Sequence, residues 1–126
     1  MFSHVILGTN DIEQSKVFYN ALLGALGANP GVVDDKGRLM FMHDGKIFGL
    51  TPPIDGQPAT HGNGSTIGFA CSSSEQVEAW HAAGVANGGQ SIEDPPGVRE
   101  SAIGNLYLAY LRDPAGNKLC ALHQMG

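Results

Sequence analysis

Two short stretches, SHVILG at residues 3–8 and STIGFA at residues 65–70, indicate that this chain is built as a repeat. A shift of 62 positions carries residue 3 onto residue 65, and the same shift carries Phe18 onto Trp80. Such agreement in register and in physical type is the mark of a repeated structural unit rather than of shared composition. We therefore expect two related halves, each of which opens with an apolar strand.

Each apolar strand is followed by the signal for the start of a helix. Asn10-x-x-Glu13 and Ser72-x-x-Glu75 both match the capping box, in which two side chains satisfy free backbone N–H groups at the first turn. The apolar spacing then predicts helices over about residues 11–23 and 74–83. The residues expected to face inward are Ile12, Tyr19, Leu22, Leu23 and Leu26 in the first helix and Val77, Trp80 and Ala83 in the second.

Short strands separated by turn residues follow each helix. The turn sequences at residues 43–46 (HDGK) and 112–118 (RDPAGNK) are typical of hairpin tips. The linker between the halves is rich in proline and glycine. The strands are predicted at about residues 2–8, 31–33, 39–43, 47–51, 66–71, 90–93, 106–112 and 118–122. One domain, residues 1–126, thus comprises a first module at about 1–52, a linker at about 53–64 and a second module at about 65–126.

Charge and composition exclude several partners. The net charge of −5 opposes binding to nucleic acid, which needs a basic surface, and to anionic membranes. No run of apolar residues is long enough to span a bilayer. The two cysteines, Cys71 and Cys120, do not form a disulfide framework and read as buried thiols. These features predict a cytoplasmic protein.

Three motifs carry a resemblance to a known family. His4-Val5, Phe18-Tyr19 with Leu23-Gly24, and the hairpin DPAGN at residues 113–117 resemble the glyoxalase, bleomycin-resistance and dioxygenase superfamily, also called vicinal oxygen chelate proteins. The resemblance covers residues 2–123. It implies an α+β fold in which paired βαβββ modules form a half-open barrel around a ligand groove, and it implies a homodimer.

The same resemblance implies where a metal ion would bind. Members of the family commonly hold one divalent cation at the first and last strands of each module, which here correspond to His4, Thr66, Phe48 (or Gly49) and Cys120. Only His4 is a good ligand for a hard cation. We therefore expect the usual metal ligands to be largely missing and assign no metal residue. An unusual site of His4, His61 and Cys120 stays open.

The groove residues can be named by strand alternation and by the resemblance. We expect His4 to be catalytic, as a general acid or base. The expected substrate-binding residues are Phe48, Thr66, Tyr110, Cys120 and Arg99. Tyr107 and Tyr110 should point to opposite faces of their strand, and Tyr110 is the one assigned to the groove. Arg99 could clamp a carboxylate or phosphate, but a surface ion pair with Glu93 or Glu100 is the simpler and favoured interpretation.

Two functions fit these residues. One is a glyoxalase-like enzyme, a lyase, isomerase or dioxygenase relative, acting on a small oxygenated organic molecule. The other is a metal-free protein that binds and sequesters a small molecule, as the bleomycin-resistance members of the family do. A structural or regulatory domain is a third reading. No cofactor is assigned.

Overall fold

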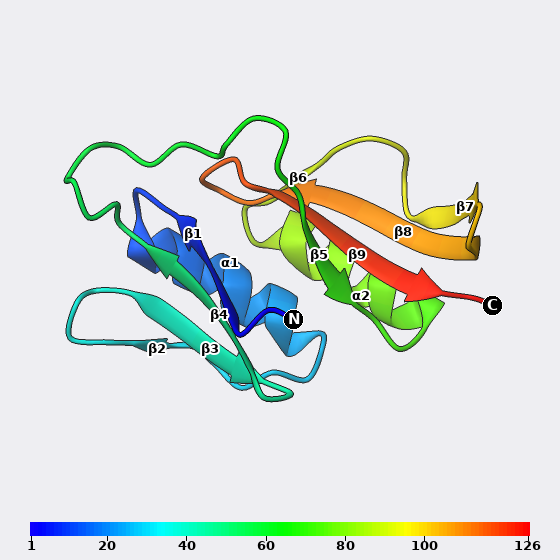
Figure 1. Ribbon diagram of the computed structural model, residues 1–126, viewed down its shortest axis with the longest axis horizontal. Helices are drawn as coiled ribbons and strands as arrows, with labels where there is room; N and C mark the ends of the chain where they lie inside the picture. Colours follow the sequence, from blue (N-terminus) through cyan, green and yellow to red (C-terminus); the bar gives the residue numbers. More distant parts are fainter.

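The structure, a computed structural model, describes all residues 1–126 and contains nine strands and two helices (Figure 1). In chain order the elements are β1 (His4–Gly8), α1 (Ile12–Gly24), β2 (Val32–Val33), β3 (Leu39–His43), β4 (Lys46–Thr51), β5 (Ile67–Ala70), α2 (Ser74–Ala86), β6 (Gln90–Ser91), β7 (Gly97–Ser101), β8 (Gly104–Arg112) and β9 (Lys118–Gln124). Neither helix has the length and apolarity needed to cross a membrane.

The strands form two mixed sheets, one from each half of the chain. The first sheet has the order β1-β4-β3-β2, and the second has the order β5-β9-β8-β6 with β7 also paired to β8. In both sheets the opening strand lies parallel to the closing strand, β1 beside β4 and β5 beside β9. The predicted α+β fold of two related half-open modules is confirmed, and the sheets do not close into a barrel.

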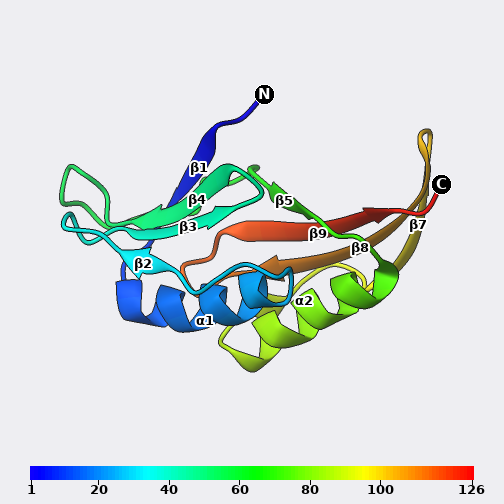
Figure 2. The ribbon, with the colours of Figure 1, turned by 90° about the horizontal axis from the view of Figure 1, so that it is seen from below.

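Both helices lie on one side of the two sheets, which leaves the opposite sheet faces open (Figure 2). The main core fills the space between the helices and the sheets, and the largest fully buried side chains in it are Trp80, Tyr19 and Phe18. The helices approach closely at Gly84, where an added Cβ would stand 2.3 Å from Leu111 Cδ1 and 3.1 Å from Leu22 Cδ1. Gly84, rather than the predicted Ala83, is the buried residue of this turn.

The N-caps of both helices lie one residue after the first residue of the predicted capping boxes, although α2 begins at residue 74 as predicted. The N-cap of α1 is Asp11, whose Oδ1 accepts from Gln14 N at 3.0 Å. The N-cap of α2 is Ser73, whose Oγ accepts from Gln76 N at 3.1 Å. Asn10 instead binds the linker, because its Oδ1 accepts from Ala59 N at 2.7 Å. A tertiary contact therefore takes the side chain that local sequence assigned to the cap.

One strand was not predicted. The sequence predicts no strand between residues 93 and 106, where Pro95-Pro96 and Gly97 are typical of a loop, yet β7 pairs antiparallel with β8 from Gly97 to Ser101. It is an edge strand, and edge strands tolerate charged residues and nearby proline. The prolines precede the paired segment, so they do not remove a hydrogen bond from the ladder.

Candidate functional site

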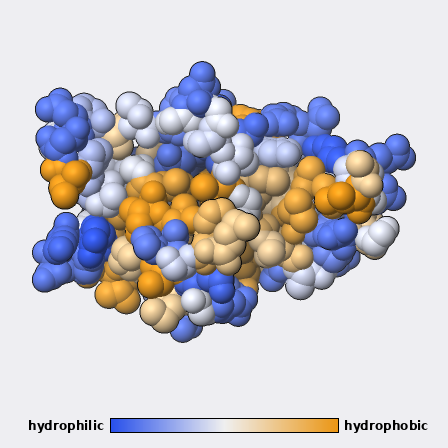
Figure 3. Space-filling view, in the orientation of Figure 1, coloured by the Kyte–Doolittle hydropathy of each residue, from blue (hydrophilic) through white to orange (hydrophobic).

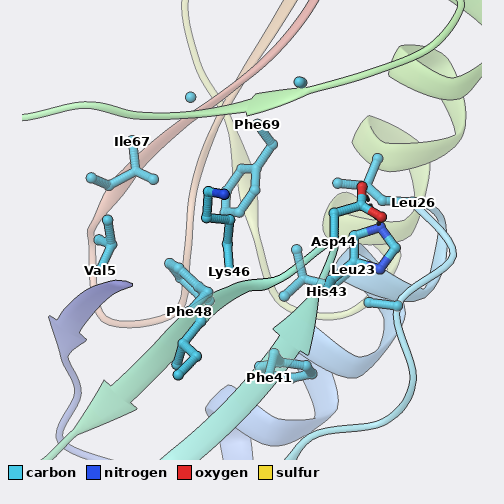
Figure 4. Close-up of a pocket in the computed structure, with 14 residues that line it drawn as sticks. Val5, Leu23, Leu26, Phe41, His43, Asp44, Lys46, Phe48, Ile67 and Phe69 are labelled. Atoms are coloured by element: carbon cyan, nitrogen blue, oxygen red, sulfur yellow. Dashed lines mark ion pairs between the residues drawn. The ribbon is translucent and has the colours of Figure 1, made fainter. Parts of the chain in front are cut away.

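A cleft of about 270 Å³ lies where the two halves of the chain meet (Figure 4). Its walls come from β1, β3 and β4 on one side and from β5 on the other, with Leu23 at the end of α1 and Leu26 just after that helix. Most of the lining is apolar. The lining residues are Val5, Leu23, Leu26, Ala28, Phe41, His43, Asp44, Lys46, Ile47, Phe48, Ile67, Gly68, Phe69 and Ala70.

Strand register explains the apolar walls. Val5 and Phe48 are register partners in the first sheet, and both lie on the face that is turned toward the helices. Phe69 holds the corresponding side of the second sheet and meets Phe48 edge to face, with ring centroids 5.3 Å apart. Because both sheets turn this face toward the helices, the cleft lies next to the aromatic core and shares Phe41, Phe48 and Phe69 with it.

Polar side chains stand at the rim of the cleft, on the β3–β4 hairpin. Asp44 and Gly45 form its tip with positive φ values of 49° and 74°, which match the tight turn predicted for Asp-Gly. His43 Nε2 lies 3.5 Å from Asp44 Oδ2. Lys46 takes part in none of the three ion pairs of the structure. The sequence predicts no role at the site for His43, Asp44 or Lys46, although alternation from Phe48 places Lys46 on the same strand face.

Of the predicted site residues, Phe48 alone lines this cleft. The expectation that it shares a face with His4 is wrong, because His4 pairs with Ile47 and alternation turns Phe48 to the opposite, helix-facing side. Phe48 packs there on Tyr19, with ring centroids 5.1 Å apart. The error arose because the last strands of the two modules were aligned with Phe48, rather than Gly49, opposite Cys120.

His4 lies on the open face of the first sheet and is exposed. Its Nδ1 is 2.7 Å from Ser3 Oγ, which orients the imidazole ring. Thr66 precedes β5 and is also exposed, so no strand pairing holds it. The structure therefore leaves both residues at open positions, away from the lining of the cleft.

Tyr110, Cys120 and Arg99 lie together on the open face of the second sheet. Tyr110 and Cys120 are register partners, and Lys118 Nζ stands 5.0 Å above the centre of the Tyr110 ring. Burial raises the pKa of the Cys120 thiol, and its hydrogen bond with Tyr110 opposes that rise. Tyr107 instead donates to Glu78 on α2, which confirms that the two tyrosines point to opposite faces.

Arg99 is held by backbone carbonyl groups rather than by a carboxylate. Its Nη2 donates to Asp94 O at 3.1 Å and to Pro95 O at 3.0 Å. Glu93, expected as one of its alternative partners, forms an ion pair with Lys118. The free N–H groups of Arg99 thus remain available to an anion.

Register also settles which residues occupy the metal positions implied by the resemblance. Ile6 pairs with Gly49 and Gly68 pairs with Cys120, and the 62-residue shift carries Ile6 onto Gly68, so Gly49 corresponds to Cys120. A Cβ added to Gly49 would stand 2.7 Å from Met40 Sδ and 2.9 Å from Ile6 Cδ1. Apolar side chains therefore occupy the space that a longer side chain would need at this position.

The donor set does not fit a cation held by four side chains. Glycine offers no side-chain donor at Gly49, and neutral threonine at Thr66 is a poor ligand. His61 lies against the second hairpin, where a Cβ on Gly116 would stand 3.2 Å from its Cδ2. No three His, Cys, Asp or Glu side chains come together in a metal-binding cluster, so one chain does not assemble His4, His61 and Cys120.

Comparison with known proteins identifies relatives of the whole chain. The family model described as Glyoxalase/Bleomycin resistance protein/Dioxygenase superfamily matches residues 1–121. A crystal structure of a glyoxalase/bleomycin resistance protein from Albidiferax ferrireducens T118 is 62% identical and has a TM-score of 0.94, with 98% of each chain covered. No curated protein gives a significant match.

More distant solved structures share the fold alone. A glyoxalase/bleomycin resistance protein/dioxygenase family enzyme from Burkholderia phytofirmans PsJN is 19% identical with a TM-score of 0.75, covering 98% of both chains. A lactoylglutathione lyase from Agrobacterium tumefaciens is 19% identical with a TM-score of 0.68, covering 98% of this chain and 92% of the other.

Proposed function

Because this chain belongs to the Glyoxalase/Bleomycin resistance protein/Dioxygenase superfamily, we propose that it binds a small oxygenated organic molecule in the cleft between its two modules, without a metal ion. The observation that carries the proposal is the cleft itself, a mostly apolar space bordered by a few polar side chains at one rim. Small-molecule sites usually have this composition. We also propose that the modules, residues 1–52 and 65–126, form one domain around it.

Metal independence rests on the chemistry of the four strand positions. His4 and Cys120 are the only metal-donor side chains among His4, Gly49, Thr66 and Cys120. One imidazole and one thiol make up only half of the four side chains that the family commonly uses for its cation. A ligand in the cleft would therefore be held by apolar contact and by direct hydrogen bonds.

Filling the cleft tests this function. Val5 and Ile67 approach each other across it (Figure 4), so Ile67→Trp should place an indole ring in the space a ligand needs. With acetophenone as a small oxygenated probe, we expect NMR shift changes at cleft residues of the unmodified protein. The affinity should fall by about tenfold or more in Ile67→Trp, because a steric clash excludes the probe.

Ile103→Trp is the matched control, since Ile103 is 67% exposed and does not line the cleft. Equal binding of acetophenone to the unmodified protein and to Ile67→Trp, or no binding to either, would contradict the proposed site.

A homodimer is part of the proposal. Figure 3 views the sheets from the side opposite the helices and shows apolar side chains gathered over both of them. Val32 and Met42 on the first sheet are 69% and 71% exposed. Exposed apolar surface of this kind is typical of an interface. Light scattering should give twice the mass of one chain, and the mass of a single chain at micromolar concentration would exclude the dimer.

The second candidate function is a glyoxalase-like enzyme in a groove that a second copy completes. The observation in its favour is the orientation of His4, whose Nδ1 meets Ser3 Oγ and whose Nε2 is left free to exchange a proton. Thr66, Tyr110, Cys120 and Arg99 would then bind the substrate on the open faces. Here too the chain would work without the family's cation.

Lactoylglutathione, named in one of the distant structural relatives, is a suitable probe for this second candidate. The binding function predicts no turnover. Turnover that falls by roughly 10²–10⁴-fold in His4→Gln, as for the loss of a general acid or base, would instead favour the enzyme. His81→Gln is the control, because His81 on α2 forms a hydrogen bond with Ser91 Oγ on β6 and lies away from His4.

A cytoplasmic location also remains our proposal. It is supported by the two cysteines, which are both free and buried, as in proteins of a reducing compartment.

A further inference from the structure

Resting on the proposed binding function, we infer that the cleft selects small aromatic carboxylates, with the carboxylate at Lys46 and the ring against the phenylalanine wall. Three observations lead to this ligand class. Lys46 has no ion-pair partner within the chain, the neighbouring Asp44 already lies close to His43, and three phenylalanine side chains line the cleft.

Lys46 directs its side chain into the cleft. It begins β4 two residues before Phe48, so alternation places both on the face that lines the cleft (Figure 4). No carboxylate of the chain pairs with its ammonium group, whereas Lys118 at the start of β9 is paired with Glu93. Lys46 is itself exposed at the mouth of the cleft, and a ligand carboxylate would supply the partner that it lacks.

The nearby acid does not favour a cationic ligand instead. Asp44 is the only acidic residue of the lining, and its side chain is 86% exposed at the hairpin tip. Its Oδ2 already lies 3.5 Å from His43 Nε2. Since the chain carries a net charge of −5, its overall field repels an anion, and selection has to come from the short contact with Lys46.

The walls favour a ring. Phe41, Phe48 and Phe69 all line the cleft, and aromatic pairs gain from edge-to-face or offset contact beyond the area they bury. At about 270 Å³ the space is slightly below the usual range for drug-sized ligands, which restricts the occupant to a small one. A single ring bearing one carboxylate satisfies the size, the wall and the cation together.

Two probes of nearly the same shape test the inference, benzoate with a charge and acetophenone without one. Calorimetry should show benzoate binding to the unmodified protein more tightly than acetophenone. Lys46→Met keeps the length of the side chain and removes its charge, so benzoate affinity should fall by roughly 10- to 100-fold, as for loss of a charged hydrogen bond, and acetophenone affinity should stay within about twofold.

Lys36→Met is the matched control, because Lys36 is exposed in the β2–β3 turn and lies outside the cleft. The inference would be overturned if benzoate affinity were unchanged in Lys46→Met, or if benzoate bound the unmodified protein no more tightly than acetophenone. In either case, binding of acetophenone would still support the proposed function. Failure of both probes to bind would overturn both.

Discussion

Replacing Asp113 with alanine is expected to lower the free energy of unfolding by about 3–5 kcal/mol, because it leaves several buried donors without an acceptor, at about 1–3 kcal/mol each. Tyr19 Oη donates to Asp113 Oδ2 at 2.5 Å, and Asn117 Nδ2 donates to the same oxygen at 2.9 Å. The backbone N–H groups of Ala115 and Asn117 donate to Oδ1 at 3.0 and 2.8 Å. Urea denaturation measures the change.

This network joins the two modules. Tyr19 belongs to α1 and is fully buried, whereas Asp113 and Asn117 belong to the β8–β9 hairpin. Asn117 Nδ2 also donates to Gly8 O at the end of β1, at 3.0 Å. Burial and the neighbouring Asp113 carboxylate raise the pKa of Tyr19, which keeps its hydroxyl protonated as a donor. Loss of Asp113 should therefore weaken the contact between modules as well as the hairpin.

Two further variants separate this network from a general effect of losing a carboxylate. Tyr19→Phe removes one donor and should cost about 1–2 kcal/mol, and its combination with Asp113→Ala should cost less than the sum, since the residues share one bond. Asp55→Ala is the control, because Asp55 is exposed and accepts only from Gln57 N. An Asp113→Ala protein as stable as the Asp55→Ala control would rule out the network.

Replacing Trp80 with alanine should cost about 3–5 kcal/mol, the usual range for removing a buried aromatic side chain. Trp80 is the largest fully buried residue and lies on α2 beside Phe69, with ring centroids 6.2 Å apart. Its removal would leave a cavity between α2 and the second sheet, which the rigid strands cannot refill. Thermal unfolding followed by circular dichroism is the measurement.

Trp80→Phe provides the comparison. The Nε1 atom of Trp80 is buried without a hydrogen-bond partner, so phenylalanine removes an unsatisfied donor while it keeps an aromatic ring. Removal of the unsatisfied donor is stabilising, whereas the smaller volume of phenylalanine leaves a gap in the core and is destabilising. The net loss of stability should therefore stay below about 2 kcal/mol. Val17→Ala, at a 59% exposed position of α1, should change stability little. A Trp80→Phe protein as unstable as Trp80→Ala would contradict this explanation.

Local sequence patterns predicted most of the elements correctly. The strand at residues 39–43 is found at its predicted bounds, and the β3–β4 turn has the expected Asp-Gly tip. The N-cap of α1 differs by one residue because Asn10 binds Ala59, 49 residues away, and a local motif contains no information about that contact. Strand β7 was missed because its pairing with β8, rather than its own composition, makes it a strand.

The sequence predicted fewer of the site residues than of the helices and strands. Phe48 was assigned to the groove and does line the cleft, but from the face opposite to that of His4. A one-residue slip in strand register exchanges all side chains between faces, and only the observed pairing of Ile6 with Gly49 removes that ambiguity. The rim residue Lys46 had no recognisable motif, since an isolated lysine beside a turn usually faces solvent.

By itself the sequence determined that the chain repeats, that each half runs strand, helix and strands, and that Asp-Gly and DPAGN close the hairpins. These properties depend on residues a few positions apart, where periodicity and turn chemistry act. The tertiary structure decided which strand faces meet the helices, where the cleft opens, and that Asp113 meets Tyr19 across 94 positions of chain. Such contacts depend on the relative placement of two packed modules, which no local pattern encodes.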